Sequence, residues 1–141
     1  MNSKSLSDYY YNHSFMDGLR KKLTELLPNT YCIAAIDIEH FRLFNKLYGR
    51  SSGDEVIRYI CACLKQSAME NDGIDAYLGG DNFVALLPDR DELLCGIREK
   101  IIKKLGKWNN TSAFFPLFGV YTIEDTSIQP ELMYDRAMLA R

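Results

Sequence analysis

The chain has 141 residues, which is the length of a single compact domain. Hydrophobic residues make up 47% of the sequence and charged residues 26%, so the composition excludes a disordered or fibrous chain. The 17 Lys and Arg residues are outnumbered by 19 Asp and Glu residues. The resulting net charge of -2 gives no basic surface for duplex nucleic acid or an anionic membrane.

The cysteines and the N-terminus predict a cytoplasmic location. The spacing of Cys61 and Cys63 fits neither a zinc knuckle nor a redox pair, and we expect Cys32, Cys61, Cys63 and Cys95 all to be reduced core thiols. The N-terminus lacks the apolar core of a signal peptide. The longest apolar strand-like run, residues 31–36, is far too short to cross a bilayer.

The first half of the chain predicts helix, strand and two helices. Apolar residues at helical spacing indicate a helix over about residues 5–27, ended by Pro28. The apolar run 31–37 is typical of a central strand covered on both faces. Aromatic residues at helical spacing then predict a short helix over 39–48, which Gly49 closes.

A capping box follows at once. The sequence Ser52-Gly-Asp-Glu55 predicts that a second, longer helix starts near Ser52. Beyond that helix, apolar runs at 74–78 and 83–87 flank Gly79-Gly80-Asp81-Asn82, which indicates a β-hairpin.

The last third predicts helix, strand and helix. Apolar residues between 93 and 105 indicate the helix, and the strand over 114–123 carries a proline, Pro116, that suits an edge or a bulge. Pro130 opens the last helix, which we expect still to run at Arg141. This order predicts an α+β fold with a mixed central sheet and flanking helices, in the style of ferredoxin-like palm domains.

Two carboxylates stand in otherwise uncharged strand contexts. Asp37 ends the central strand and Asp81 lies in the hairpin turn, so both reach the same edge of the sheet if the hairpin pairs beside that strand. Two carboxylates and a backbone carbonyl suit Mg²⁺, which takes its remaining ligands from water and substrate phosphates. The structural alternative is that Asp37 caps the next helix and Asp81 only forms a turn, and on the pair alone this alternative is favoured.

Other polar residues have structural explanations as well. Asn45 suits a solvated position on a short helix, and Asp54 suits the first turn of a helix, where the macrodipole favours a carboxylate. Gly79 and Gly80 need only turn geometry. Arg42 is a candidate for phosphate contact or an ordinary surface cation. These residues carry a functional hypothesis only when they are taken together.

Taken together, they resemble a GGDEF domain. The similar segments are Ile36-Asp-Ile-Glu-His-Phe-Arg-Leu-Phe-Asn-Lys-Leu-Tyr-Gly49, Ser52-Gly-Asp54 and Leu78-Gly-Gly-Asp-Asn-Phe83, with weaker similarity at Tyr11-Asn-His-Ser-Phe15 and Ala137-Met-Leu-Ala140. GGDEF domains are the family of diguanylate cyclases, which join two GTP molecules, each held by one protomer of a dimer, into cyclic di-GMP. The resemblance implies a palm-like nucleotidyl-cyclase fold.

The resemblance also implies roles for single residues. Asp37, Asp81 and the carbonyl of Ile38 match the positions that bind metal. Asn45 and Asp54 match the pair that reads the guanine edge, a task that suits an amide and a carboxylate. The positions around the phosphates, where backbone amides and glycines approach the nucleotide, match His40, Phe41, Arg42, Gly79 and Gly80.

The chain departs from the family pattern at the fourth motif position. Asn82 stands where the family has its catalytic glutamate, and an amide does not act as a general base. The loss of such a group typically costs ~10²–10⁴-fold in rate. The missing negative charge also weakens the magnesium site. Tyr77 replaces the arginine usual before the Gly-Gly pair.

Two further departures concern regulation and chain length. Glu70 and Gly73 occupy the positions of the arginine and aspartate of the family's product-inhibition motif, so we expect that site to be absent. The chain ends before the lysine that contacts the triphosphate, which suggests a piece of a longer protein. We expect residues 1–28 to be an N-terminal helix leading into the domain, and residues 29–141 to be a GGDEF-like domain truncated in its closing helix.

The favoured hypothesis is a degenerate GGDEF domain in cyclic di-GMP signalling. It binds GTP, with weak or conditional Mg²⁺, and regulates an attached domain such as an EAL phosphodiesterase without making product. A slow but active diguanylate cyclase is the alternative, and a dimerisation scaffold with an empty pocket is a further one. Intact Asn45 and Asp54 argue against the scaffold, because an empty pocket has no use for guanine-reading residues. The expected partners are GTP, a second protomer or attached signalling domains.

Overall fold

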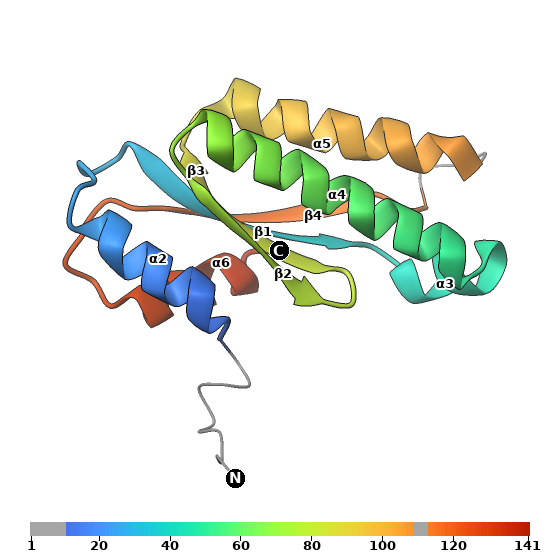
Figure 1. Cartoon of the computed structure of the whole chain (residues 1–141), viewed down its shortest axis with the longest axis horizontal. Coiled ribbons are helices and arrows are strands. Elements are labelled where there is room, and N and C mark those ends of the chain that lie inside the picture. The colour runs from blue at the N-terminus through green and yellow to red at the C-terminus, as the bar shows by residue number, and fades with distance from the viewer. Residues whose placement is uncertain (1–10, 109–112) are drawn as a thin grey trace, which may run out of the picture.

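The computed structural model describes residues 11–108 and 113–141. In this part of the chain, helices lie on both faces of a four-stranded sheet (Figure 1). In chain order the elements are α2 (His13–Leu23), β1 (Tyr31–Ile38), α3 (Phe41–Tyr48), α4 (Arg50–Glu70), β2 (Ile74–Gly79), β3 (Asn82–Pro88), α5 (Asp91–Leu105), a short 3₁₀ helix (Gly106–Trp108), β4 (Pro116–Thr122) and α6 (Pro130–Leu139).

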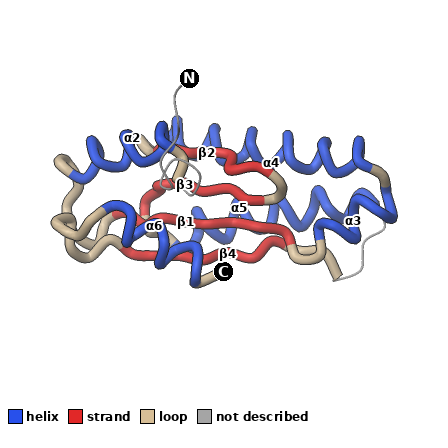
Figure 2. Tube along the Cα trace, turned by 90° about the horizontal axis from the view of Figure 1, so that it is seen from below, coloured by secondary structure: helices blue, strands red, loops and turns tan. Residues whose placement is uncertain are grey.

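The sheet has the strand order β2-β3-β1-β4 (Figure 2). Each hydrogen-bonded pair in it is antiparallel. The α+β class with flanking helices is confirmed, but the prediction of a mixed sheet is wrong. The crossover through α3 and α4 does bring β2 back in the direction of β1. However, β3 lies between these two strands, so they never pair with each other. The strand that contains Pro116 is β4, and it lies at the edge as predicted.

The two faces of the sheet carry separate apolar cores. Side chains alternate along a strand, so Ile36 and Ile38 of β1 pack with α4 and α5, whereas Ile33 and Ala35 pack with α2 and α6. The same alternation in β3 places Phe83 on the α4 side and Val84 on the α6 side. By the same parity, Asp37 and Asn82 both lie on the α6 side of the sheet.

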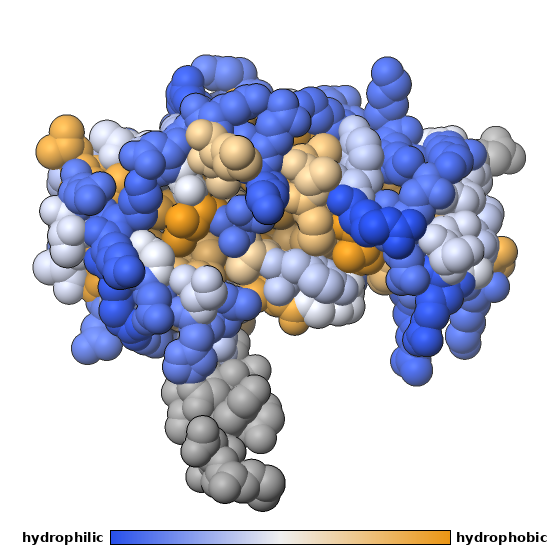
Figure 3. Space-filling model, in the orientation of Figure 1, coloured by the Kyte–Doolittle hydropathy of each residue, from blue (hydrophilic) through white to orange (hydrophobic). Residues whose placement is uncertain are grey.

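The edge strand β2 is only partly buried. Tyr77 on this strand is 43% exposed. The space-filling view shows hydrophilic side chains over the helices and apolar patches between them in the middle of the view, where β2 lies in the same orientation (Figures 1 and 3).

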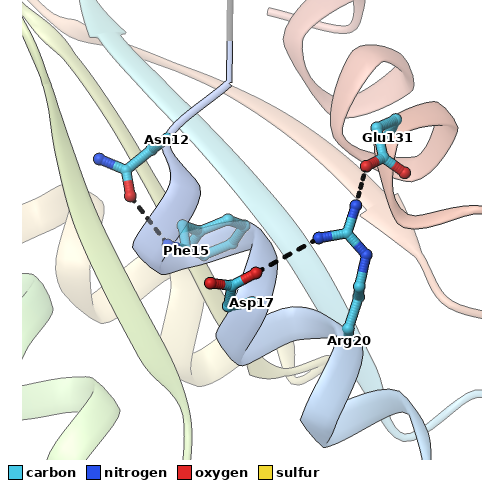
Figure 4. Close-up of polar contacts among 5 residues, drawn as sticks. All are labelled: Asn12, Phe15, Asp17, Arg20 and Glu131. Carbon is cyan, nitrogen blue, oxygen red and sulfur yellow. Dashed lines mark hydrogen bonds and ion pairs between the residues drawn. The ribbon is translucent and has the colours of Figure 1, made fainter. Parts of the chain in front are cut away.

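Helix α2 has a defined start and is tied to α6. The Asn12 side chain accepts a hydrogen bond from the backbone N–H of Phe15 at 2.8 Å, which is an N-cap. Arg20 of α2 contacts Asp17 and pairs with Glu131 of α6 (Figure 4). The helix ends at Leu23, short of the predicted end at Pro28. Thr24 is its C-cap, and both its backbone N–H and its hydroxyl donate to the carbonyl of Lys21. Residues 5–10 of the predicted helix lie outside the described residues.

The predicted capping box at Ser52 is wrong. Gly49, with φ 90° and ψ 156°, is at once the C-cap of α3 and the N-cap of α4, so α4 begins at Arg50. This backbone conformation is one that glycine adopts readily, and it turns the chain between the helices in a single residue. Ser52 therefore lies inside the first turn, and Asp54 lies beyond it. The explanation of Asp54 by the helix macrodipole thus fails.

Two smaller expectations also fail. Helix α6 ends at Leu139 with Ala140 as its C-cap and does not run on to Arg141, whose side chain donates to the carbonyl of Met138 at 3.1 Å. The cysteines are free as predicted, but Cys95 on α5 is exposed and not a core thiol. Within residues 11–108 and 113–141, no helix has the length and apolar character needed to cross a membrane.

Candidate functional site

The first acidic residue of the site is Asp37, near the end of β1. Its Oδ2 lies 3.3 Å from a guanidinium nitrogen of Arg141, and its Oδ1 is buried without a hydrogen-bond partner among the described residues. Burial raises the pKa of Asp37, and the neighbouring carboxylates of Asp81 and Glu39 raise it further against the opposing effect of Arg141. Asp37 does not cap α3, whose N-cap is His40, so that structural alternative is wrong.

The hairpin brings Asp81 to the same place. The carboxylate of Asp81 accepts a hydrogen bond from the backbone N–H of Ile38 at 3.0 Å, so it does more than form a turn. Gly79 (φ 95°) and Gly80 (φ 55°) make the turn, and both lie in the left-handed region that favours glycine. The prediction that Asp37 and Asp81 meet at one edge of the sheet is confirmed.

Tyr77 of β2 is hydrogen-bonded to the turn of the hairpin. Its hydroxyl donates to the carbonyl of Gly80 at 2.6 Å. Burial raises the pKa of the Tyr77 phenol, and the nearby Cys61, Asp81 and Asp54 raise it as well. Tyr77 therefore lies within electrostatic reach of both the hairpin acid and the acid on α4.

The loop between β1 and α3 places the predicted phosphate-contacting residues. His40 is exposed and adopts φ 60° and ψ 30°, a left-handed conformation that turns the chain from strand to helix. Phe41 and Arg42 are the first residues of α3, where an α-helix leaves N–H groups without intrahelical partners. Phe41 is half-buried and stacks on Phe44 with ring centroids 5.9 Å apart, while Arg42 is exposed.

Asn45 and Asp54 lie on the two helices that follow. The Oδ1 atom of Asn45 is buried and makes no hydrogen bond to the described residues. It lies against Gly53 of α4, where an added Cβ would come within 1.9 Å of it. Gly53 thus lets α3 and α4 approach closely around Asn45, and the next residue, Asp54, is exposed. We call Asn45, Gly53 and Asp54 the helical half of the site.

Arg141 was not predicted as a site residue. Its guanidinium donates a hydrogen bond to the side-chain oxygen of Asn82 and lies beside Asp37. Gly119 of β4 allows this, because a Cβ there would lie 2.1 Å from the carbonyl oxygen of Ala137 and 2.6 Å from the backbone nitrogen of Arg141. We call Asp37, Asp81, Asn82 and Arg141 the sheet half of the site.

The only sequence signal for the close contact between β4 and the backbone around Arg141 was a glycine within a strand. Such a residue often marks a close backbone contact, but Gly119 alone does not reveal which side chain arrives. A single cation after a helix has no pattern in the sequence. Arg141 was therefore missed.

A pocket of about 380 Å³ opens beside the sheet half. Asn82 and Arg141 contribute to its wall, together with Tyr11, Leu78, Tyr134, Asp135 and Met138. The hydroxyl of Tyr11 donates to Asp135 at 3.0 Å, and its ring meets that of Tyr134 edge to face with centroids 5.4 Å apart. The pocket thus has aromatic and charged walls, and it borders the Asn82 position.

Solved structures share this fold. A sensory box/GGDEF family protein from Caulobacter crescentus CB15 superposes with a TM-score of 0.69 at 22% identity, covering 92% of this chain and 88% of that one. The GGDEF domain of DgcB from Caulobacter crescentus, solved in complex with c-di-GMP, gives a TM-score of 0.68 at 24% identity, covering 90% and 77%. These similarities establish the palm-like α+β fold of GGDEF domains.

Curated relatives are similar in sequence. The probable diguanylate cyclase DgcT of Escherichia coli K12 is 23% identical over 137 residues, which is 92% of this chain and 30% of that protein. The diguanylate cyclase DgcM of the same organism is 40% identical over 62 residues, which is 44% of this chain and 15% of that protein. The chain therefore spans less than a third of the length of these two relatives.

The family profile covers most of the chain. The profile described as "Diguanylate cyclase, GGDEF domain" matches residues 9–126, a range that includes β1, the hairpin, the helical half of the site and every residue of the sheet half except Arg141. By this match the chain belongs to the GGDEF domain family.

Proposed function

We propose that this GGDEF domain acts in cyclic di-GMP signalling by binding GTP and regulating an attached domain, without making cyclic di-GMP itself. The single observation that carries the proposal is the contrast between the two halves of the site. The helical half keeps the amide and carboxylate of the family motif, while the sheet half has an amide, Asn82, where catalysis needs a carboxylate.

Guanine binding is supported by the state of Asn45. A buried polar atom without a partner is unusual in a folded protein and calls for an explanation, and the Oδ1 of Asn45 has no hydrogen-bond partner in the part of the chain that the structure describes. It does not hold α3 and α4 together by a hydrogen bond to the described residues. A side chain kept for nucleobase recognition explains an amide here, and the exposed Asp54 supplies an acceptor for the N–H donors of guanine.

The residues of the sheet half fit one Mg²⁺ ion. Mg²⁺ uses few protein oxygens and takes the rest from water and phosphates. The carboxylates of Asp37 and Asp81 share one end of the sheet, and the Oδ1 of Asp37, which accepts no hydrogen bond from residues 11–108 or 113–141, can act as a ligand. Asp37, Asp81 and the carbonyl of Ile38 would hold the ion, which supplies neutralisation of phosphate charge when bound.

Proton abstraction is the step that this chain lacks. A general base must be able to take up a proton from the attacking hydroxyl, and the Asn82 amide does not ionise for this purpose. Its oxygen already accepts a hydrogen bond from Arg141. The proposed domain therefore holds substrate in its site and leaves it unchanged.

Regulation of a neighbouring domain fits a site that binds without turnover. The fraction of domains that hold GTP then follows the GTP concentration. If two conformations of a longer protein differ in their affinity for GTP, binding shifts the equilibrium towards the conformation that binds more tightly. The proposed attached domain is an EAL phosphodiesterase. The proposed partner of the GTP-bound domain is a second protomer.

The test is calorimetric titration of the domain with GTP and with ATP. Adenine reverses the donor and acceptor pattern of the guanine edge, so ATP should bind at least about tenfold more weakly than GTP. Asn45→Ala should remove most of this preference. Gln66→Ala, an exposed amide further along α4, should keep it.

Equal affinity for both nucleotides, or no affinity for either, would contradict GTP binding. Preserved selectivity in Asn45→Ala would contradict the role of the helical half. Each result refers to a different part of the proposal.

A slow diguanylate cyclase is the second candidate. It is favoured by the presence of both Asp37 and Asp81 at one end of the sheet, because metal ions alone contribute to phosphoryl transfer. Detection of cyclic di-GMP would decide for this candidate.

A further inference from the structure

The Arg141 guanidinium is held on three sides. One of its nitrogens lies 3.3 Å from the Asp37 carboxylate and donates to the Asn82 side-chain oxygen, while Nε donates to the carbonyl of Met138 at 3.1 Å. The side chain is 22% exposed and that of Asp37 is 25% exposed. A half-buried, multiply bonded guanidinium is more strongly fixed than a solvated surface cation.

The position matters because of what surrounds it. The carboxylates of Asp81 and Glu39 lie within electrostatic reach of Asp37, and Arg141 supplies the opposite charge. Among residues 11–108 and 113–141, no group of three or more His, Cys, Asp or Glu side chains is arranged to hold a metal ion. The sheet half thus offers few anionic ligands, and one of them, Asp37, is already paired with the Arg141 guanidinium.

We propose that Arg141 is a built-in cation of this site, which binds the Asp37 carboxylate in place of a divalent metal ion and lowers the affinity of the site for Mg²⁺. Mg²⁺ requires near-octahedral oxygen coordination at short distances and gives up its waters reluctantly. An ion that binds Asp37 must displace the guanidinium or accept repulsion from it.

Asn82 makes this arrangement possible. A neutral amide oxygen accepts from the guanidinium without adding negative charge, so Arg141 and Asp37 balance each other. A glutamate at position 82 would add a third carboxylate beside Asp37 and Asp81. The excess negative charge would then favour a divalent cation over a single guanidinium.

This inference deepens the proposed function, since it concerns the metal requirement of the site proposed to bind GTP. It separates experimentally from GTP binding, because metal affinity is measured without nucleotide. Loss of GTP selectivity would not affect the proposed role of Arg141. Failure of the metal-binding test would likewise not affect the proposal that the domain binds GTP.

The experiment titrates Mn²⁺, a spectroscopically visible substitute for Mg²⁺, into the nucleotide-free chain and follows free ion by electron paramagnetic resonance. We expect weak binding to the unmodified chain and at least about tenfold tighter binding to Arg141→Met. Arg141→Lys should stay close to the unmodified chain, because it keeps the charge. Arg136→Met is the matched control and should change nothing, because Arg136 lies on α6 and its guanidinium stacks over the Tyr121 ring.

Two further variants make the result specific. Asp37→Asn combined with Arg141→Met should abolish the gain, since the freed carboxylate is then missing. Asn82→Glu should also raise Mn²⁺ affinity, and it leaves the end of α6 unaltered if Arg141→Met proves unstable in thermal unfolding.

Unchanged or weaker Mn²⁺ binding in folded Arg141→Met would overturn the proposal. Should that variant not fold, unchanged binding in Asn82→Glu would overturn it instead. A gain that survives Asp37→Asn would contradict it too, because the extra ion would then bind elsewhere.

Discussion

The helical half and the sheet half of the site are held by different forces. Asn45 is held by shape, through the close approach of α3 and α4 at Gly53, and its amide oxygen makes no hydrogen bond to the described residues. Asp37 and Asn82 are held by charge and hydrogen bonds to Arg141, which arrives from beyond α6. The nucleobase recognition and the metal binding that we propose would therefore rest on separate residues, so that one half can change while the other is retained.

Gly119→Ala should have the largest effect, and it acts on the sheet half. The added Cβ would meet the Ala137 carbonyl oxygen at 2.1 Å, and this backbone atom cannot rotate away. We expect the free energy of unfolding in urea to fall by ~1–3 kcal/mol. Gly96→Ala on α5 is the control, because among the described residues no atom beyond its chain neighbours and its own helix backbone lies within 4 Å of the added Cβ. Equal stability of the two variants would show that α6 does not need the close approach.

Gly53→Ala should damage the helical half alone. Its Cβ would lie 1.9 Å from the Oδ1 of Asn45, so the amide must move. We expect GTP affinity to fall about 10- to 100-fold in calorimetry, as for the loss of one or two buried hydrogen bonds. Mn²⁺ binding by the sheet half should stay unchanged. A Gly53→Ala chain with unaltered GTP affinity would refute the importance of this contact.

Asp37→Asn should stabilise the fold at neutral pH. Burial raises the pKa of Asp37 in the folded state, so the folded protein binds more protons than the unfolded one between the ordinary value and the raised one. The stability that Asp37 contributes is present below its ordinary pKa, and it falls as the pH rises from the ordinary pKa through the raised pKa of the folded state. Thermal unfolding should show a melting temperature a few degrees higher for Asp37→Asn at pH 7, with the difference vanishing in acid. A lower melting temperature at pH 7 would mean that the Arg141 pair outweighs burial.

Glu55, beside the helical half, should respond to pH in the opposite direction and more weakly. Hydrogen bonds from Lys104 and Lys107 lower the pKa of Glu55 to about 2 from its ordinary 4.5. The stability that it contributes is therefore present above pH 4.5 and is lost as pH falls towards 2. Because the pair is solvated, we expect only a small loss in Glu55→Gln at pH 7 and none below the folded pKa. If the acid unfolding curves of the unmodified chain and of Glu55→Gln coincide at every pH, Glu55 does not contribute to stability in this way.

The smallest expected effect is the absence of cyclic di-GMP binding at the product-inhibition position. Glu70 lacks the positive charge that would pair with phosphate. At Gly73 a Cβ would lie 2.1 Å from the backbone oxygen of Leu86, so an aspartate does not fit there. Titration with cyclic di-GMP should give no saturable micromolar binding, and Glu70→Arg alone should not create it. Saturable binding that Glu70→Arg strengthens would contradict this expectation.

Sequence patterns predicted the elements because hydrophobic periodicity is local, and β1, the hairpin, α5 and β4 are found where apolar runs indicated them. The antiparallel sheet was missed because the insertion of β3 between β2 and β1 is decided by packing across the whole sheet. The helix start near Ser52 was predicted to within two residues, but its cap was missed, because the N-cap is Gly49 with a positive φ and not a side chain of the Ser52 pattern. Arg141 was missed because its partners, Asp37 and Asn82, lie far away in the sequence.

Retention of GTP without conversion is the central claim, and the fate of bound nucleotide tests it most directly. The chain is incubated with Mg²⁺ and GTP for hours at a protein concentration high enough to favour dimers, and the nucleotides retained by the protein and those free in solution are separated by chromatography. We predict that the retained nucleotide is GTP and that cyclic di-GMP stays at the level of a protein-free control. Cyclic di-GMP that accumulates above this control, and that disappears in Asp37→Asn, would contradict the claim and identify a slow diguanylate cyclase.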